Sequence, residues 1–268
     1  TNHGRDQRQR VRAAFRRDGT LLGIEADIVS NLGAWNAAPT RPTAVLTGFA
    51  LAGPYRVPAI RFRIRCAVTN TTPQSAYRGA GRPEASYLLE RLMDAAAARL
   101  GLDPVTIREK NLLRPEDFPY TSPTGVPYDS GNYPAVLAEA LRRFDYAAAR
   151  REQAALRAQG RLVGIGIASF CELSGPGWES ATVRAHPDGS VTVLCGIAPS
   201  GQGHATMLAQ VVGEVLQLPL ERIRAITGDT AAVQQGIGTF GSRSTALGGS
   251  AAYLAAQEVL EKARLIAA

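Results

Sequence analysis

The chain has 268 residues, 45% of them hydrophobic and 20% charged, which is typical of a folded globular protein with a sizeable core. No run of about 18 apolar residues occurs, so the sequence excludes a membrane span. The net charge of +7 admits a basic nucleic-acid binder. The arginines are scattered, however, and lack the interleaved aromatic residues of a single-strand binder, so we expect no nucleic-acid partner.

The cysteines give a first indication of the compartment. Cys66, Cys171 and Cys195 lie far apart in apolar, strand-like runs, and no Cys-x-x-Cys spacing occurs. This argues against a zinc or iron–sulfur centre held by the protein. An odd cysteine count and a polar start without a signal peptide predict a cytoplasmic protein.

The first half begins with a predicted hairpin. The pair Asp18-Gly19 separates residues 11–17 from 20–29, and Asp-Gly tolerates the positive φ of a tight turn. Residues 60–68 alternate between apolar and mostly arginine side chains. This alternation predicts a strand with one buried face and one face that is wet or covered by a partner.

A glycine turn then leads into a helix. Gly79 and Gly81 form the turn, and Pro83 suits the first turn of a helix. Apolar residues repeat at helical spacing over residues 85–100, and Gly101 is expected to end the helix.

The rest of the chain mixes helices and strands. Asp103 is the expected cap of a short helix to about residue 113, and residues 114–134 form an ordered loop. The further predicted elements are a charged helix to about Gly160, a strand at 162–171, an Asp-Gly hairpin at 182–195, a helix at 202–217, a strand at 223–227 and a helix from Ala246. Because βαβ alternation is absent, we predict an α+β fold of two mixed α/β subdomains, residues 1–145 and 146–268.

Two glycine-rich turns, residues 199–206 and 241–245, are the main candidates for ligand binding. Each leads into a helical pattern, where unpaired backbone N–H groups can hold an anion. The first turn lacks the third glycine of the dinucleotide fingerprint, and it has no lysine of a phosphate loop. Taken alone, each turn is also compatible with plain chain reversal. Together they indicate a large, multiply anionic ligand.

Several charged residues are candidates for chemistry. Arg78 precedes the glycine turn at a strand end, where its paired N–H donors could hold a substrate or an oxyanion; the alternative is a surface salt bridge. His204 is a candidate base or a structural residue. The spacing alone does not rank three glutamates as bases: Glu84, Glu172 and Glu179.

Four stretches carry a resemblance when they are taken in order: residues 53–60, 76–84, 201–210 and 228–245. They resemble the molybdenum-cofactor subunit of the xanthine dehydrogenase, aldehyde oxidase and carbon monoxide dehydrogenase family. In this family the pterin's own sulfurs hold the metal, so the resemblance implies no metal ligand from the protein. The protein supplies binding, orientation and electrostatics.

The resemblance implies a role for each matching residue. Gln202 matches the glutamine at the molybdenum–pterin centre, and Gly203 and Thr206 share its loop. Gly241, Ser242, Arg243, Ser244 and Thr245 match the loop around the pterin and its phosphate or nucleotide tail. Arg78 matches the arginine that orients substrate, and Ala76, Tyr77 and Gly79 are expected to line the same loop.

The resemblance also implies a reaction. In the carbon monoxide dehydrogenase branch a cysteine follows the arginine and holds copper, whereas this chain has Gly79. We therefore expect a molybdopterin-dependent oxidoreductase that hydroxylates an aldehyde or a purine-like N-heterocycle with oxygen from water. The family's base glutamate and an upstream glycine-rich motif have no match, so we expect a central fragment of a longer subunit. The alternative is a non-catalytic cofactor-binding or scaffold piece.

The expected cofactor is a molybdenum–pterin in mononucleotide or cytosine dinucleotide form. The expected partners, besides a small-molecule substrate, are iron–sulfur and FAD subunits or domains. The resemblance further implies a dimer of heterotrimers as the full assembly.

Overall fold

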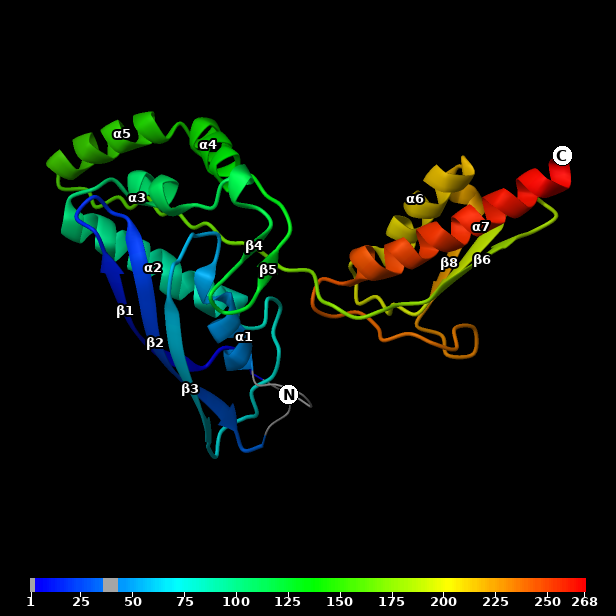
Figure 1. Ribbon diagram of the computed structural model, residues 1–268, viewed down its shortest axis with the longest axis horizontal. Coiled ribbons are helices and arrows are strands. Elements are labelled where there is room, and N and C mark those ends of the chain that lie inside the picture. Colours follow the sequence, from blue (N-terminus) through cyan, green and yellow to red (C-terminus); the bar gives the residue numbers. More distant parts are fainter. Residues whose placement is uncertain (1–2, 36–42) are drawn as a thin grey trace. The chain divides into compact units, whose positions relative to one another are not determined.

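The computed structural model describes residues 3–35 and 43–268 of the chain (Figure 1). These residues divide into two compact units, unit 1 (Thr1–Glu172) and unit 2 (Leu173–Ala268). The subdomains predicted from the sequence, residues 1–145 and 146–268, stay a prediction. Mixed helices and strands confirm the predicted α+β class.

Unit 1 is built on a three-stranded sheet in the order β1 (Gln7–Phe15), β2 (Leu21–Gly33) and β3 (Ile60–Val68). β1 and β2 are antiparallel and form the predicted hairpin, whereas β3 pairs with β2 in parallel. Gly19 has a φ of +89° in the turn, and the Asp18 carboxylate accepts from the Thr20 N–H at 3.0 Å. These two residues therefore act as the sequence predicts.

The sheet of unit 1 has one apolar face and one charged face. Residues Ile24, Ala26 and Ile28 of β2 are buried, and helix α2 (Arg82–Leu100) packs on the sheet (Figure 1). The opposite face carries the exposed arginines of β1 and β3 on either side of two acidic residues of β2: Arg8, Arg10, Arg12, Arg61, Arg63, Arg65, Glu25 and Asp27.

The ends of α2 follow from local signals in the sequence. Gly81 precedes the helix with a φ of +91°, Pro83 lies in the first turn, and Gly101 ends the helix at a φ of +67°. Asp103 accepts from the Val105 N–H at 2.8 Å and caps α3 (Pro104–Asn111). All four features confirm the prediction.

A buried polar network joins α2 to α3. The fully buried Arg108 donates to Glu90 at 2.8 Å and to Asp94 at 2.9 Å, and the Tyr55 hydroxyl donates to Glu90 at 2.5 Å. Desolvation and the neighbouring Glu90 carboxylate raise the pKa of Tyr55, so the phenol stays protonated as a donor.

The predicted charged helix consists of two helices, α4 (Tyr133–Phe144) and α5 (Tyr146–Ala158). Asp145 interrupts it with a left-handed backbone, at a φ of 50° and a ψ of 59°. Its carboxylate accepts from the Ala148 N–H at 3.2 Å, so one residue ends α4 and caps α5.

The strand predicted at residues 162–171 is wrong. This segment lies in unit 1 and is extended, but it joins no sheet. Side chains bind its carbonyls instead: Gln153 donates to Val163 O at 2.9 Å, and Arg108 donates to Ile167 O at 3.0 Å. An apolar run cannot distinguish this arrangement from a ladder.

Unit 2 has the same strand pattern as unit 1. β6 (Ala181–Ala185) and β7 (Val191–Cys195) form the predicted hairpin, and β8 (Ile223–Thr227) pairs with β7 in parallel. Helices α6 (His204–Leu216) and α7 (Ser250–Ala267) cover this sheet (Figure 1). The core between them includes Val193, Cys195, Ile197, Leu208, Val212, Ala252 and Ala256.

The C-terminal helix differs from its prediction at its start. A π-helix over Ser244–Gly249 precedes α7, where the sequence predicts one α-helix from Ala246. Such wide turns occur often next to functional sites.

Short elements complete the two units: α1 (Thr43–Phe49), β4 (Tyr120–Thr121), β5 (Pro127–Tyr128) and 3₁₀ helices at Ala50–Ala52, Pro115–Asp117 and Leu220–Arg222. The predicted ordered loop at 114–134 contains β4, β5 and one of these 3₁₀ turns. In the described part of the chain, no helix combines the length and the apolar character that crossing a membrane requires.

Candidate functional site

In unit 1 the loop that carries Arg78 is tightly wound. Three consecutive residues, Gly79, Ala80 and Gly81, have φ angles of +97°, +38° and +91°. Ala80 N–H donates to Tyr77 O at 2.7 Å, and Arg82 N–H donates to Gly79 O at 3.2 Å. A positive φ at alanine is strained, and such strain persists only where the surroundings hold it.

Arg5 supplies part of this support. Its guanidinium carbon lies 4.5 Å from the centre of the Tyr77 ring, and its Nη2 donates to the Arg78 carbonyl. Its Nε lies 3.7 Å from the Glu84 carboxylate. The side chain of Arg78 is exposed and forms no hydrogen bond or ion pair within residues 3–35 and 43–268. Arg5 therefore fixes the loop and leaves the Arg78 guanidinium accessible.

The neighbours of Arg78 differ in exposure. Ala76 and Tyr77 are exposed, and Gly79 is partly buried. A Cβ on Gly79 would lie 2.6 Å from Pro83 Cγ, so both the positive φ and the available space require glycine.

Two of the three candidate bases lie in unit 1, and both are near arginines. The Glu84 side chain is 8% exposed, and its Oε2 has no hydrogen-bond partner among the described residues. Glu172 pairs with Arg82 at 3.2 Å. The position of neither carboxylate supports a role as the catalytic base.

In unit 2 the first glycine turn opens α6. Gly201 and Gly203 have φ angles of +105° and +79°. Gly203 is the N-cap of the helix, and among the described residues no side chain caps the first turn. The first N–H groups of α6 are therefore open to a ligand. Gln202 is exposed and accepts from the Ser200 N–H at 2.5 Å, and Thr206 is exposed in the first helical turn.

The second turn opens the π-helix. Gly241 and Ser242 both have positive φ angles, 59° and 60°, and Gly241 O accepts from the Gly175 N–H at 2.7 Å. Ser244 is buried, whereas Thr245 is exposed.

Thr239 joins the two turns. Its hydroxyl accepts from the Ala198 N–H at 3.1 Å and from the Ser244 hydroxyl at 3.1 Å, and it lies 3.5 Å from His204 Nδ1. Residues 196 and 236 also touch, because a Cβ on Gly196 would lie 2.5 Å from Gly236 Cα. The fold thus brings together two turns that lie far apart in the sequence. The sequence gives no sign of the role of Thr239 except its place within the 228–245 motif.

Arg243 and Glu179 have structural positions. Both side chains are fully buried, and Arg243 Nη1 donates to Glu179 Oε2 at 2.8 Å. Glu179 also accepts from the N–H groups of Ile237 and Gly238, at 2.9 and 3.2 Å. This carboxylate is closed to solvent and fully bonded, so it is not an accessible base. His204 is likewise buried, and its Nδ1 lies 3.5 Å from the Thr239 hydroxyl, which favours its structural alternative.

The residues of unit 2 fit an anionic, hydrogen-bonding cofactor. They offer open N–H groups at the start of α6, an exposed amide at Gln202, and an exposed hydroxyl at both Thr206 and Thr245. Positive-φ backbone at residues 201, 203, 241 and 242 lets the main chain approach a ligand closely. Within the described residues, no group of three or more His, Cys, Asp or Glu side chains is placed to hold a metal ion.

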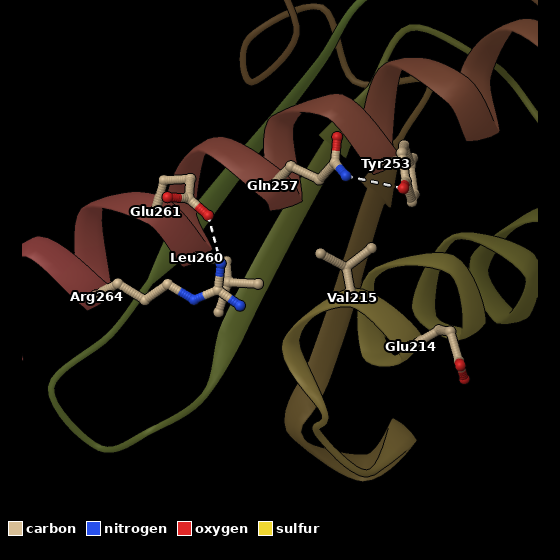
Figure 2. A pocket seen from close by; sticks show the side chains of 7 residues that line it. All are labelled: Glu214, Val215, Tyr253, Gln257, Leu260, Glu261 and Arg264. Atoms are coloured by element: carbon tan, nitrogen blue, oxygen red, sulfur yellow. Dashed lines mark hydrogen bonds and ion pairs between the residues drawn. The ribbon is translucent and has the colours of Figure 1, made fainter.

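A separate hollow lies between α6 and α7, at the far end of α6 from the glycine turn (Figure 2). Figure 2 shows Tyr253 and Gln257 joined by a 2.8 Å hydrogen bond and Glu261 paired with Arg264 at 2.6 Å. It contains none of the site residues predicted from the sequence.

Comparison with known proteins identifies two family models, both described as a molybdopterin cofactor-binding domain. One matches residues 1–112 and the other residues 139–268. The large chain of carbon monoxide dehydrogenase from Hydrogenophaga pseudoflava is 39% identical, over 100% of this chain and 36% of that protein.

Two further similar proteins have names that refer to 6-hydroxypseudooxynicotine and to quinoline. The 6-hydroxypseudooxynicotine dehydrogenase complex subunit gamma from Paenarthrobacter nicotinovorans is 38% identical, over 100% of this chain and 34% of that protein. The crystal structure of quinoline 2-oxidoreductase from Pseudomonas putida 86 superimposes with a TM-score of 0.91 at 34% identity, over 97% of this chain and 35% of that one. The chain thus spans about a third of the length of these relatives.

Proposed function

Because the chain belongs to the molybdenum-cofactor-binding subunits of the xanthine dehydrogenase, aldehyde oxidase and carbon monoxide dehydrogenase family, we propose that unit 2 binds the molybdenum–pterin cofactor through its two glycine turns. The observation that carries this proposal is the Thr239 contact, which brings the turn at 199–206 next to the turn at 241–245. Two glycine turns at one place, one of them leading into a helix start with open N–H groups, suit a ligand with several anionic groups.

We propose the residue roles that the resemblance to the family implies, and the exposure of the side chains is compatible with them. Gln202, Gly203 and Thr206 contact the pterin, with Gln202 nearest the metal. The backbone of residues 241–245 and the Thr245 hydroxyl wrap the phosphate or nucleotide tail, whereas Arg243 is turned into the protein. When it is bound, the cofactor supplies the redox chemistry, and the protein binds and orients it.

Arg78 orients the substrate. Its exposed guanidinium has no partner in the described part of unit 1, and an arginine offers paired donors to a carbonyl or ring nitrogen. Ala76, Tyr77 and Gly79 line the same loop. The resemblance to the family implies a catalytic base outside this chain. The three candidate glutamates are compatible with this proposal, because Glu179 is buried in an ion pair and Glu84 and Glu172 each lie next to an arginine.

The proposed reaction is oxidation of an aldehyde or an N-heterocycle, with oxygen from water. Gly79 supports this substrate class over carbon monoxide, since Pro83 leaves no room for a copper-binding cysteine at that position. Quinoline, the substrate in the name of one relative, is an N-heterocycle.

Membership of the family supports four further proposals. These are iron–sulfur and FAD partners, a pterin in mononucleotide or cytosine dinucleotide form, a dimer of heterotrimers and a cytoplasmic location.

The test is to purify the full-length subunit with its neighbouring subunits and to measure molybdenum, pterin and turnover. We expect about one molybdenum and one pterin per subunit, and reduction of a dye by an aldehyde or an N-heterocycle. Cofactor without turnover on any such substrate would support the non-catalytic alternative. Absence of both metal and pterin would overturn the binding proposal.

A further inference from the structure

We infer that Arg243 and Glu179 form a buried clasp that positions the cofactor loops of unit 2, and that Arg243 acts through the loop backbone without touching the cofactor. The clasp is the ion pair Arg243–Glu179 with the backbone groups that it holds. It deepens the proposed function, on which its link to the cofactor rests.

The guanidinium of Arg243 bonds to protein groups on every side. Nη1 donates to Glu179 at 2.8 Å and to Gly238 O at 2.6 Å. Nη2 donates to Trp178 O, and Nε donates to Pro176 O at 3.4 Å. The side chain is fully buried, so no part of it remains for an external anion.

Glu179 completes the clasp from the other side. Its Oε1 accepts from Ile237 N–H at 2.9 Å, and its Oε2 accepts from Gly238 N–H at 3.2 Å. The pair therefore ties together three segments of unit 2: residues 176–179, 237–238 and 243. Gly196 packs directly on the Glu179 carboxylate, which adds the strand end before the first glycine turn.

A buried ion pair seldom stabilises a fold more than apolar side chains of similar volume do. Matched apolar side chains often replace such a pair without loss of stability, whereas removal of one partner leaves a buried charge and is costly. The specific contribution of this pair is geometric, because it fixes backbone groups that a methyl or methylene group cannot hold.

The turn immediately before Arg243 contains a strained residue. Ser242 has a φ of +60° immediately before Arg243, and Gly241 has a φ of +59°. Arg243 itself is right-handed, with a φ of −99° and a ψ of −18°. A left-handed residue followed by a right-handed one turns successive N–H groups toward one point, which is the geometry of an anion-binding nest. The clasp anchors this turn directly beside the strained residue.

The test uses the full-length subunit in its complex and compares four variants with the wild type. Arg243→Met and Glu179→Gln break the clasp, and Arg243→Met/Glu179→Leu removes both charges. The matched control is Arg184→Met, which removes an exposed arginine from β6 of the same unit. The readouts are hydrogen exchange of the backbone amides, thermal unfolding, molybdenum and pterin per subunit, and the KM for substrate.

We expect at least tenfold faster exchange at residues 236–242 and at least fivefold less molybdenum and pterin in Arg243→Met, with unchanged KM in the loaded fraction. Glu179→Gln should change in the same direction, and Arg184→Met should match the wild type. The double variant separates positioning from stability: we expect it to regain the wild-type unfolding temperature but not the cofactor content.

Wild-type cofactor content in the double variant would overturn the inference. Loss of cofactor in Arg243→Met without faster exchange would also overturn it, because it would indicate direct contact. If Arg243→Met does not fold, the double variant and Glu179→Gln decide the question. If the wild-type complex holds no pterin, the proposed function fails, and unchanged exchange in the variants would separately show that no clasp exists.

Discussion

Arginine has at least three different uses in this chain. Arg78 is exposed without a partner among the described residues, whereas Arg5 reaches over Tyr77 to hold the loop that carries Arg78. Arg108 and Arg243 are fully buried and bond to carboxylates and carbonyls. All of them contribute to the same net positive charge, but only the first is free to meet a substrate.

Replacement of Arg78 tests the substrate role. In Arg78→Ala we expect unchanged molybdenum and pterin, but kcat/KM reduced by roughly 10- to 150-fold. This range corresponds to a lost hydrogen bond to a charged group, about 1.5–3 kcal/mol. The measurements are metal analysis and steady-state kinetics on the complex, with the exposed arginine variant Arg99→Ala as control. An equal loss of cofactor would show that Arg78 belongs to cofactor binding.

Gln202 tests the cofactor role at the same scale. Its exposed amide lies between two left-handed glycines, and no apolar packing depends on it. We therefore expect Gln202→Ala to fold normally, with an unfolding temperature near that of the wild type, and to retain less molybdenum and pterin. Unchanged metal content together with unchanged activity would contradict the assignment.

At the scale of elements, the turn before α2 depends on Gly79. In Gly79→Ala the positive φ costs about 1–2 kcal/mol, and the clash with Pro83 adds to this cost. Gly125→Ala is a matched control, because Gly125 has a φ of +81° but no heavy atom within 4 Å of an added Cβ. We expect Gly79→Ala to lower the unfolding temperature of the subunit more than Gly125→Ala does. Equal effects would show that Pro83 yields without cost.

The elements that the sequence predicts best are those with local signals. Asp18-Gly19 and Asp188-Gly189 mark the hairpins of the two units, and Gly81 and Gly101 bound α2. The extended segment 162–171 misleads, because its carbonyls bond to side chains of Gln153 and Arg108 that only the folded chain brings near. The break at Asp145 and the π-helix after Arg243 likewise depend on backbone geometry that apolar spacing does not encode.

The site follows the same division. The glycine turns are legible because glycine is required for positive φ within a few residues. The Arg243–Glu179 pair joins residues 64 positions apart and has no periodic signature, so the sequence does not reveal it. The resemblance instead implies that Arg243 belongs to the cofactor loop, and the sequence leaves Glu179 as one of three unranked candidate bases. Thr239 is missed for the same reason.

At the scale of the whole molecule, each unit repeats one plan. A hairpin supplies two antiparallel strands, a third strand joins in parallel, and helices cover one face. Each unit has its own apolar core. Two independent cores allow one unit to carry the proposed cofactor loops and the other the proposed substrate arginine.

The glycine turn of unit 1 predicts which substrates the full enzyme oxidises. Relatives at similar identity include a carbon monoxide dehydrogenase and a quinoline oxidoreductase, so identity alone does not separate the two reactions. We propose that Gly79 separates them, because a cysteine at this position would need a φ of +97° and would place its Cβ 2.6 Å from Pro83 Cγ.

We therefore expect the purified complex to contain molybdenum without stoichiometric copper and to reduce a dye with quinoline or an aldehyde, but not with carbon monoxide. After many turnovers in water labelled with ¹⁸O, the accumulated product should carry the label, since water is the proposed oxygen source. Carbon monoxide oxidation, with or without copper, would refute the substrate assignment and leave the binding of the cofactor by unit 2 intact. Unlabelled product would instead refute the proposed oxygen source, and it would leave the proposed role of the Gly79 loop in substrate selection intact.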